Sequence, residues 1–266
     1  MRTADVNELL ALAVTLATAA GAELLARQTA FSIDGPAVET KSSASDPVTA
    51  ADRASEKLIT DGLAAARPED GLLGEEGAAK PSVSGITWVI DPLDGTVNYL
   101  YGRPDWAVSI AAEDDAGALV GVVHQPRTGL TWQAVRDGGA TRNGVRLEVR
   151  ESRGPAAALV STGFSYLAER RAEQAEYLRR VLPAVRDLRR GGSAALDLCA
   201  VADGTVDAYY EHVIQRWDVA AGGLVAREAG AQTVGGPGTP LPDGVLAASP
   251  ALADALLDLL EPWPSL

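Results

Sequence analysis

The chain is poor in cysteine, histidine and aromatic residues, and each shortage excludes something. Cys199 is the only cysteine among the 266 residues, so no disulfide can form within the chain and a reducing compartment is expected. It lies in an apolar run, which favours a small buried side chain over a nucleophile. The two histidines, His124 and His212, have no partner at metal-ligand spacing, which argues against a zinc site. Aromatic residues make up only 5% of the chain, so the core must consist mainly of Ala, Val, Leu and Ile.

Positive charge is also scarce. The chain has 23 Lys and Arg against 36 Asp and Glu, which gives a formal net charge of −13. Nucleic acid and anionic membranes would repel such a chain, so we expect neither as a direct partner. Acidic residues that converge can instead bind divalent cations, although acidic surfaces that serve only solubility are common.

A long uninterrupted membrane-spanning run is not apparent. The apolar segment 9–22 is shorter than the ~20 residues that a bilayer span needs, and two threonines interrupt it. Before it stand only Arg2 and the opposing charge of Asp5, a weak pattern for a signal peptide. The segment therefore predicts an amphipathic surface helix that runs to about Arg27, and a cytoplasmic protein.

The pattern of predicted strands and helices changes near residues 145–155. A capped helix is predicted over 50–66, a buried strand over 86–90, and an antiparallel sheet with glycine-rich turns from 106 to 147. Strands and helices alternate afterwards, which is typical of an α/β half. The second half is predicted to hold strands at 157–161, 206–210 and 245–248, and helices at 169–188, from 193, at 219–229 and at 251–260. The expected domains are 1–148, with most metal ligands, and 149–266, with the substrate-facing residues and Asp218.

Two carboxylates follow the predicted buried strand, in the segment 91–96 with the sequence Asp-Pro-Leu-Asp-Gly-Thr. Side chains at positions i and i+3 of a continuous strand point to opposite faces, so Asp91 and Asp94 can converge only if the chain turns between them. Pro92 ends regular pairing, and Gly95 allows a backbone conformation that other residues avoid. Converged carboxylates, with a carbonyl between them, are the oxygen ligands that Mg²⁺ prefers.

An ordinary solvated turn is the alternative interpretation, since Asp, Pro and Gly dominate turns. Two unit charges 4 Å apart interact by about 1 kcal/mol in water and about 4 kcal/mol at an effective dielectric of 20. Converged carboxylates would therefore repel a phosphate dianion unless divalent cations reversed the sign. A simple turn also leaves unexplained Glu75-Glu76, between two glycines, and Trp217-Asp218, before a small-residue helix.

Four motifs in order resemble those of the inositol monophosphatase family. The run 88–99, Trp-Val-Ile-Asp-Pro-Leu-Asp-Gly-Thr-Val-Asn-Tyr, resembles its first signature, and 217–223, Trp-Asp-Val-Ala-Ala-Gly-Gly, resembles its second. The segments 74–77 and 46–52 match its other landmarks, and the resemblance covers about 41–231. It implies an α/β (α+β) fold, a layered α/β/α/β/α sandwich, and a homodimer.

The resemblance also implies a set of metal ligands. Glu75, Asp91 and the Leu93 carbonyl would hold a first Mg²⁺, and Asp91, Asp94 and Asp218 would hold a second. Glu75 would also contribute to a third, looser site, which lithium would occupy as an inhibitor. Two such ions would promote an in-line displacement at phosphorus without a phosphorylated side chain.

Other residues are assigned catalytic and binding roles by the same resemblance. Thr96 and Asp52 would orient and deprotonate the attacking water with Glu75, although both could merely cap helices. Lys41 would be the basic residue of a loop near the metals. Asp197 and Glu76 are expected to lie outside the ligand set, and Glu211 could be a solvated acid. The predicted substrate contacts are Asp94, Gly95, Thr96, Gly192, Ser193, Ala194, Glu211 and Asp218.

The implied activity is hydrolysis of a small polyol or sugar phosphate monoester, with inositol monophosphate as the favoured substrate. Members that act on fructose 1,6-bisphosphate, histidinol phosphate or phosphoadenosine phosphate share the metal motifs and remain alternatives. A bisphosphate would need a second basic pocket, for which Arg189-Arg190 and Arg216 are candidates. Arg189-Arg190 is more simply explained as a helix C-terminus.

Two rival functions remain open. The haloacid-dehalogenase-type phosphatases also have an Asp-Gly-Thr motif, but their two aspartates are two residues apart, whereas Asp91 and Asp94 are three apart with a proline between them. Some bacterial relatives act on RNA polymerase or ribosome assembly, which makes a regulatory binding protein the alternative from another class. The complete predicted ligand set favours catalysis.

Overall fold

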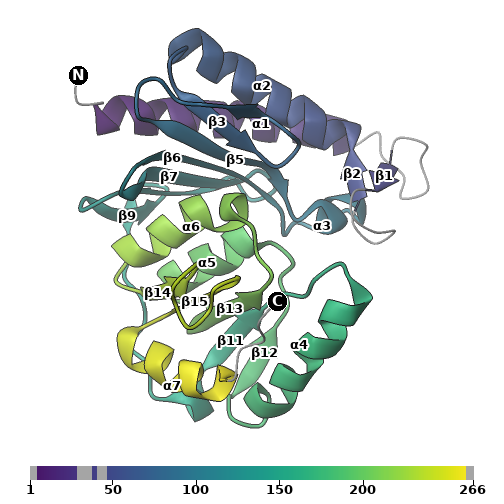
Figure 1. Cartoon of the computed structure of the whole chain (residues 1–266), viewed down its shortest axis with the longest axis vertical. Coiled ribbons are helices and arrows are strands. Elements are labelled where there is room, and N and C mark those ends of the chain that lie inside the picture. The colour runs from purple at the N-terminus through teal and green to yellow at the C-terminus, as the bar shows by residue number, and fades with distance from the viewer. Residues whose placement is uncertain (1–4, 29–37, 41–46, 262–266) are drawn as a thin grey trace.

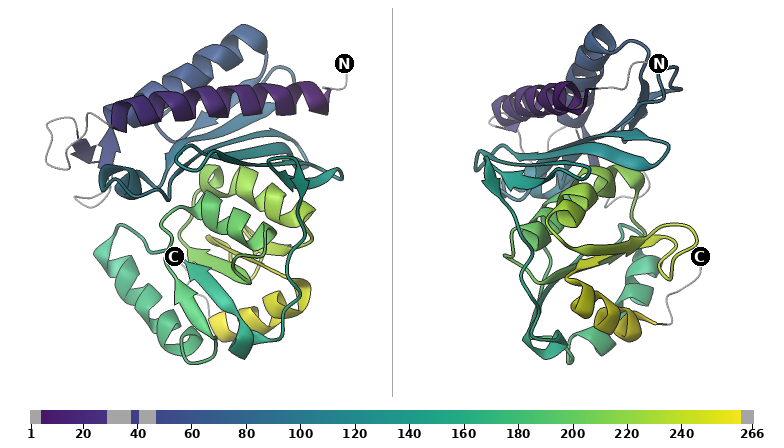
Figure 2. Two further views of the ribbon diagram at one scale, coloured as in Figure 1. Left: turned by 180° about the vertical axis from the view of Figure 1, so that it is seen from behind. Right: turned by 90° about the vertical axis from the view of Figure 1, so that its left-hand side faces the viewer.

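The described residues form five layers. The structure is a computed structural model that describes residues 5–28, 38–40 and 47–261. Two helices cover an eight-stranded sheet, two more lie between this sheet and a five-stranded one, and a last pair covers the far face (Figures 1 and 2). From the first layer to the last, the helices are α1 (Val6–Gln28) and α2 (Ala50–Ala66), α5 (Ala194–Ala202) and α6 (Arg216–Glu228), and α4 (Ala168–Val181) and α7 (Pro250–Leu260). The predicted α/β/α/β/α sandwich is confirmed.

The larger sheet has the strand order β10-β9-β8-β7-β6-β5-β3-β4. Neighbours are antiparallel apart from β3 and β5, which run parallel. The predicted Asn143-Gly144 turn joins β9 to β10 with positive φ angles of 48° and 79°, a conformation that suits a two-residue hairpin. The strands are β3 (Gly71–Gly74), β4 (Ala79–Lys80), β5 (Thr87–Asp94), β6 (Ala107–Asp114), β7 (Gly117–Gln125), β8 (Leu130–Val135), β9 (Gly139–Arg142) and β10 (Val145–Arg146).

The smaller sheet has the order β12-β11-β13-β15-β14, in which β11 lies parallel to both β12 and β13. Its strands are β11 (Leu159–Thr162), β12 (Asp187–Arg189), β13 (Ala208–His212), β14 (Gln232–Gly235) and β15 (Gly244–Ala248). The remaining short elements are the antiparallel pair β1 (Val38–Thr40) and β2 (Pro47–Thr49), the helix α3 (Thr96–Leu100) and one 3-10 turn. This 3-10 turn, Pro155–Ala157, precedes β11.

The helix predicted over 169–188 is too long. Helix α4 ends at Val181, and Asp187–Arg189 forms the edge strand β12. Pro183 explains the early end, because proline has no backbone N–H to donate and its ring clashes with the preceding turn of a helix. The basic pair Arg189-Arg190 therefore follows a strand, and the predicted helix C-terminus there is wrong.

Helix α1 is longer than the apolar segment from which it was predicted. Over its 23 residues it is long and apolar enough to span a bilayer, so the length argument against such a span is wrong. One face of α1 is buried, since Leu9, Leu16 and Leu24 pack with α2 and the larger sheet, and the other face is exposed, as expected for a surface helix.

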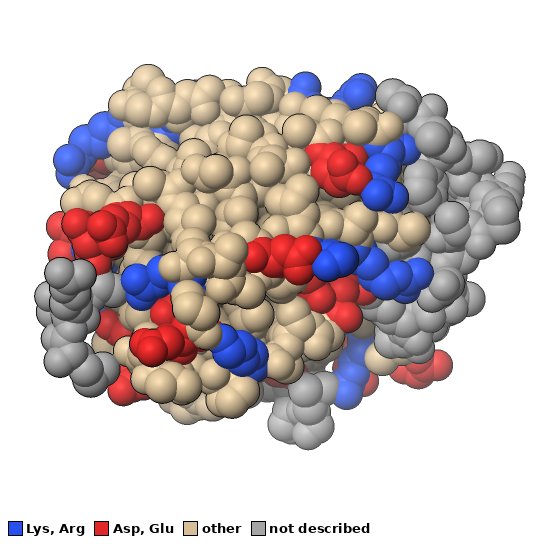
Figure 3. Space-filling view, turned by 90° about the horizontal axis from the view of Figure 1, so that it is seen from above, with Lys and Arg blue, Asp and Glu red and all other residues tan. Residues whose placement is uncertain are grey.

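Seen from above, the outer face of the molecule has small, mixed groups of acidic and basic residues around uncharged surface (Figure 3).

The middle helices α5 and α6 are part of the hydrophobic core beside the larger sheet. Ala195 and Cys199 of α5, and Ala221 and Leu224 of α6, are buried in one cluster with residues of the larger sheet. Cys199 is thus the small buried side chain that its apolar surroundings predict. We propose to keep the domain division at 148/149 as a topological one, since the larger sheet ends before it and the smaller sheet begins after it.

Candidate active site

A β-bulge brings the two central carboxylates to one face. In the pairing of β5 with β6, Asp91 lies opposite Ser109 and Asp94 lies opposite Ala107. Three steps along β5 therefore match two steps along β6, and the extra residue shifts the alternation of side chains. Because residues two apart on β6 share a face, Asp91 and Asp94 also come to share one. The expected turn between them is therefore a bulge within a strand that continues to Asp94.

Gly95 ends the strand and begins α3. Its φ of 92° lies in the left-handed region, which glycine adopts without strain. A Cβ at this position would lie only 2.9 Å from the Asp105 carbonyl oxygen, so no larger residue fits without movement. The change of direction places the backbone of Gly95 and Thr96 beside the bulge.

The first turn of α2 fixes the end of β5 from behind. The Thr96 hydroxyl lies 3.1 Å from Asp52 Oδ1 and 3.1 Å from the Leu93 carbonyl oxygen, both acceptors for its single hydrogen. Ser55 Oγ donates to the Pro92 carbonyl at 2.8 Å. Asp52 is fully buried and Thr96 is 6% exposed, so the pair is a fixed part of the interior rather than a solvated helix cap.

Glu75 reaches the same place from the parallel neighbour of β5. It directly follows β3, and its backbone N–H donates to the Ile90 carbonyl at 3.2 Å. The buried Glu56 of α2 pins this loop, because its carboxylate accepts from the backbone N–H groups of Glu76 at 2.9 Å and Ala78 at 3.1 Å. Gly74 leaves the space, since a Cβ there would lie 2.2 Å from Glu56 Oε2.

Glu56 is a supporting residue that the sequence reasoning missed. A signal was present, because Asp52, Ser55 and Glu56 lie with Ile59 on the buried side of α2. Polar side chains on the inner face of an amphipathic helix need partners there, which marks them for a structural or functional role.

The second half contributes two helix N-termini. Asp94 accepts hydrogen bonds at the start of α5 from Ser193 Oγ at 2.5 Å and from the backbone N–H of Ala195 at 2.7 Å. Asp218 lies in the first turn of α6, where its Oδ2 accepts from the backbone N–H of Gln215 at 2.8 Å. Both carboxylates thus face positive helix ends, which favour negative charge.

Three of the neighbouring carboxylates, those of Asp91, Asp94 and Asp218, have raised pKa values. Burial, then Glu75, Asp94 and Asp218, raise the pKa of Asp91 well above its usual range. Burial, then Asp94, Glu75 and Glu211, raise the pKa of Asp218, although the hydrogen bond from the Gln215 N–H acts to lower it. Burial raises the pKa of Asp94 to about 6, although its hydrogen bonds from Ser193 and Ala195 act in the opposite direction. A divalent cation would remove this repulsion, so the donor set suits one.

The carboxylates are neighbours, but they are not arranged as a finished coordination shell. Across 5–28, 38–40 and 47–261, no group of three or more His, Cys, Asp or Glu side chains has the mutual spacing of a metal site. Asp91 and Asp94 instead direct oxygens to protein donors, including the Leu93 N–H at 3.0 Å from Asp91 Oδ1. The fit to a metal therefore rests on the chemistry and burial of the four acids.

One cavity of about 490 Å³ joins most of the predicted site residues. Asp91, Leu93, Thr96 and Asp52 are not part of its lining and are buried in the adjoining protein. Lys41 lies outside the described residues. The predicted residues that line the cavity are Glu75, Asp94, Gly95, Gly192, Ser193, Ala194, Glu211 and Asp218.

Sequence reasoning missed other parts of the wall. The loop 163–167 after β11 and Trp217 line the cavity. Arg190, a candidate for a second basic pocket that the sequence pattern explains more simply as a helix end, also lines it. Arg216, the other candidate for a second basic pocket, forms an ion pair with Glu113 and does not line this cavity.

The Glu211 side chain, on β13, is closely packed. Its Oε2 accepts from the Tyr209 hydroxyl at 2.6 Å, and a Cβ on Gly163 would lie 1.7 Å from the same oxygen. Burial raises the pKa of Glu211 to about 7, although Tyr209 and Arg190 act to lower it. Asp197 does not line the cavity, and its Oδ1 accepts from Ser161 Oγ at 2.5 Å.

Buried acids around a cavity of about 490 Å³ suit a metal-dependent phosphomonoester hydrolase, and similarity to known proteins agrees. The model of the inositol monophosphatase family matches residues 5–262. The inositol-1-monophosphatase of Mycobacterium leprae is 44% identical over 280 residues, which cover 97% of this chain and 94% of that protein. The chain belongs to the inositol monophosphatase family.

Solved structures show the same fold. The structure of SuhB from Mycobacterium tuberculosis matches with a TM-score of 0.83 and 40% identity, and covers 97% of this chain and 98% of that one. The extragenic suppressor protein suhB from Bartonella henselae matches with a TM-score of 0.88 and 33% identity, over 97% and 100% of the two chains.

Proposed function

We propose that this chain hydrolyses inositol 1-phosphate to inositol and inorganic phosphate, with Mg²⁺ as its metal. The observation that carries the proposal is the single cavity that joins Asp94 and Asp218 to Glu211 and the Ser193 region. Acids suited to phosphate-binding cations and hydrogen-bonding groups suited to polyol hydroxyls thus share one cavity, in which Ser193 Oγ donates to Asp94. The inositol-1-monophosphatase named in Mycobacterium leprae supports the choice of substrate.

The proposed metal ligands are Glu75, Asp91 and the Leu93 carbonyl for one ion, and Asp91, Asp94 and Asp218 for another. Hard oxygen donors of this kind favour Mg²⁺ among the common divalent cations. When bound, the ions supply Lewis-acid chemistry: they neutralise phosphate charge and make a water more acidic. Asp91 is common to both sets, which agrees with its burial and its central place among the acids.

Thr96 and Asp52 are proposed to position the attacking water and receive its proton. The Thr96 hydroxyl hydrogen has two acceptors, Asp52 Oδ1 and the Leu93 carbonyl oxygen. Its oxygen can therefore accept a hydrogen bond from water while its own proton is directed toward Asp52. Glu75, on the adjoining loop, is proposed to help orient the same water.

Phosphate and polyol are proposed to bind at separate groups of residues. The backbone N–H groups of Gly95 and Thr96 would donate to phosphate oxygens at the start of α3. Glu211 would accept from inositol hydroxyls, and Ser193, with the backbone of Gly192 and Ala194, would complete the polyol side. These roles are supported by the cavity that Gly95, Gly192, Ser193, Ala194 and Glu211 line together, with Thr96 next in sequence to Gly95.

Several family properties are retained as proposals. We expect a cytoplasmic homodimer that lithium inhibits, with Lys41 in a loop beside the metals. The acidic charge of −13 supports the expectation that neither nucleic acid nor an anionic membrane is a direct partner.

Steady-state kinetics with Mg²⁺ test the substrate directly. Inositol 1-phosphate is compared with fructose 1,6-bisphosphate, histidinol phosphate and phosphoadenosine phosphate, and its kcat/KM is expected to be highest. Equal or better turnover of the bisphosphate would overturn the inositol preference. An Asp94→Asn variant serves as the blank for contaminating phosphatase.

A second, non-catalytic role is a separate candidate. The protein named Nus factor SuhB in Pasteurella multocida is 39% identical to this chain over 84% of its length. A regulatory role in RNA polymerase function or ribosome assembly is therefore proposed as the alternative. Co-purification of RNA polymerase with both the wild type and Asp94→Asn would support it, and recovery with neither would count against it.

A further inference from the structure

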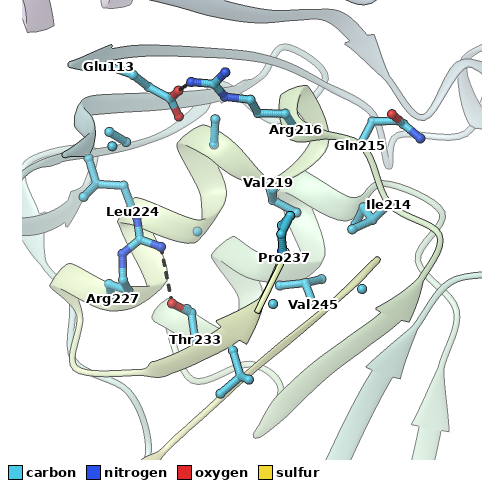
Figure 4. Close-up of a pocket in the computed structure, with 18 of the residues that line it drawn as sticks. Glu113, Ile214, Gln215, Arg216, Val219, Leu224, Arg227, Thr233, Pro237 and Val245 are labelled. Atoms are coloured by element: carbon cyan, nitrogen blue, oxygen red, sulfur yellow. Dashed lines mark hydrogen bonds and ion pairs between the residues drawn. The ribbon is translucent and has the colours of Figure 1, made fainter. Parts of the chain in front are cut away.

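A second hollow lies on the other side of helix α6. It is a cleft of about 810 Å³ between α6, the β6–β7 turn and the β14–β15 connection (Figure 4). Trp217 and Asp218 of α6 line the active-site cavity, whereas Val219, Leu224 and Arg227 line this cleft. Its size is within the roughly 300–1,000 Å³ typical of small-molecule sites.

The wall of the cleft is largely apolar. Ile214, Val219, Pro237 and Val245 gather around its interior (Figure 4). Gly223 leaves one part open, because a Cβ on this helical residue would meet only Arg227 Nη1, at an ordinary contact distance of 3.6 Å. An apolar group placed here would be removed from water at little steric cost.

Most charges around the cleft already have partners. Arg216 pairs with Glu113, and Arg136 forms two hydrogen bonds with Asp114, at 2.8 and 3.2 Å. The six charged lining residues, three of each sign, are Glu113, Arg136, Arg216, Arg227, Glu228 and Asp243.

The two remaining acids are also engaged. Glu228 accepts from the backbone N–H groups of Asp137 at 2.9 Å and Gly139 at 2.8 Å. Asp243 Oδ2 lies 3.0 Å from His212 Nε2. Both carboxylates thus have donors outside the guanidinium groups of the cleft.

Arg227 differs from the other two arginines. Its guanidinium donates to the neutral hydroxyl of Thr233 at 3.3 Å, as Figure 4 shows. No carboxylate in the described part of the chain forms an ion pair with it, although Glu228 is its sequence neighbour. A cation at the edge of an apolar cleft is the feature that recognises an amphipathic anion.

We propose that this cleft binds an amphipathic monocarboxylate, with its carboxylate on Arg227 and its apolar part against Val219 and Ile214. A single negative charge fits because the lining charges sum to zero and one cation lacks an acidic partner. A phosphate dianion would bring a second charge close to Glu113 and Glu228. The site is independent of the proposed catalytic function, since none of the proposed catalytic or metal-binding residues takes part.

Calorimetric titration of the full chain with sodium octanoate tests the site. The wild type is expected to bind saturably, and Arg227→Gln to bind at least about tenfold more weakly, since a charge-assisted contact is lost. Gly223→Leu is expected to abolish binding by filling the cleft. Arg179→Gln is the matched control, because Arg179 is a highly exposed arginine in the last turn of α4.

Chain-length analogues separate the charge requirement from simple apolar binding. Octanol and octyl phosphate are expected to bind more weakly than octanoate, and thermal unfolding confirms that each variant is folded. No saturable binding by the wild type, or equal affinities in the wild type and Arg227→Gln, would overturn the proposal.

Discussion

The active-site cavity and the cleft lie on opposite sides of α6 and differ in how their charged side chains are balanced. In the active-site cavity, the carboxylates of Asp94 and Asp218 lie near Glu75 and Asp91, and Arg190 is the cation that lines the wall. In the cleft behind, arginines and acids are equal in number and most have partners. Uncompensated buried charge therefore marks the place where a counterion must come from outside the chain.

The largest effect is expected from the acid shared between the two halves. Asp94→Asn removes a proposed metal ligand and should lower kcat/KM by at least about 100-fold. This is more than the loss usually caused by mutating a residue that only supports a ligand. The fold should survive, because the amide retains the size of the side chain and relieves repulsion. Phosphate release and thermal unfolding measure the two outcomes, and substantial remaining turnover would remove Asp94 from the metal site.

Metal binding should stabilise the native state. At a free Mg²⁺ concentration 100-fold above Kd, linkage adds about 2.7 kcal/mol. For a chain of this size, that corresponds to an increase in Tm of roughly 5–10 °C. Chelation should reverse the increase, and Asp94→Asn should reduce it. An equal increase in both proteins would place the cation elsewhere.

The loop that carries Glu75 should depend on Glu56. In Glu56→Gln, the amide cannot accept from both backbone N–H groups, so we expect a loss of about 1–3 kcal/mol in the free energy of unfolding. Because Glu75 would be displaced with its loop, the Mg²⁺ concentration needed for activity should also rise. Urea denaturation and metal titration measure these changes.

Asp61→Asn is the control for Glu56→Gln. Asp61 is exposed on the same helix, α2, and forms an exposed ion pair with Lys57. A change of similar size in both variants would contradict the special role of Glu56.

The smallest effect is expected in the cleft. Glu113→Gln weakens the ion pair with Arg216, whose side chain is 55% exposed although that of Glu113 is buried, so the cost should be about 1 kcal/mol. Catalytic parameters should stay unchanged, because Glu113 does not line the active-site cavity. A marked loss of activity would show that the two sides of α6 are coupled, and that they cannot be contrasted as separate sites.

Local signals predicted the elements whose ends are set by local chemistry. The helix over 50–66 begins and ends where predicted, and the Asn143-Gly144 hairpin forms because both residues tolerate positive φ. The strand 86–90 was located, but its continuation through Asp94 was not. Two acids three residues apart, with Pro92 between them and Gly95 after them, suggested a turn, whereas pairing with β6 keeps this segment in the sheet.

The remaining features depend on contacts distant in sequence. Glu56 pins a loop 20 residues away, and Ser193 reaches Asp94 across 99 residues. Arg190 faces the cavity only because Pro183 ends α4 early and a strand follows. The order of the four motifs identified the family, but no spacing within the chain indicated which of their neighbours would complete the wall.

The bulge in β5 also constrains how the gene for this chain can change. Loss of one codon between Asp91 and Asp94 would be harmless in a surface loop, but here it would restore the regular two-residue alternation. The two acids would then stand two residues apart and would still share a face, but the extra residue of the bulge, and with it one backbone carbonyl between them, would be lost. Substitutions alter side chains at this site, whereas a change of length at the bulge would alter the backbone between two proposed metal ligands in a single step.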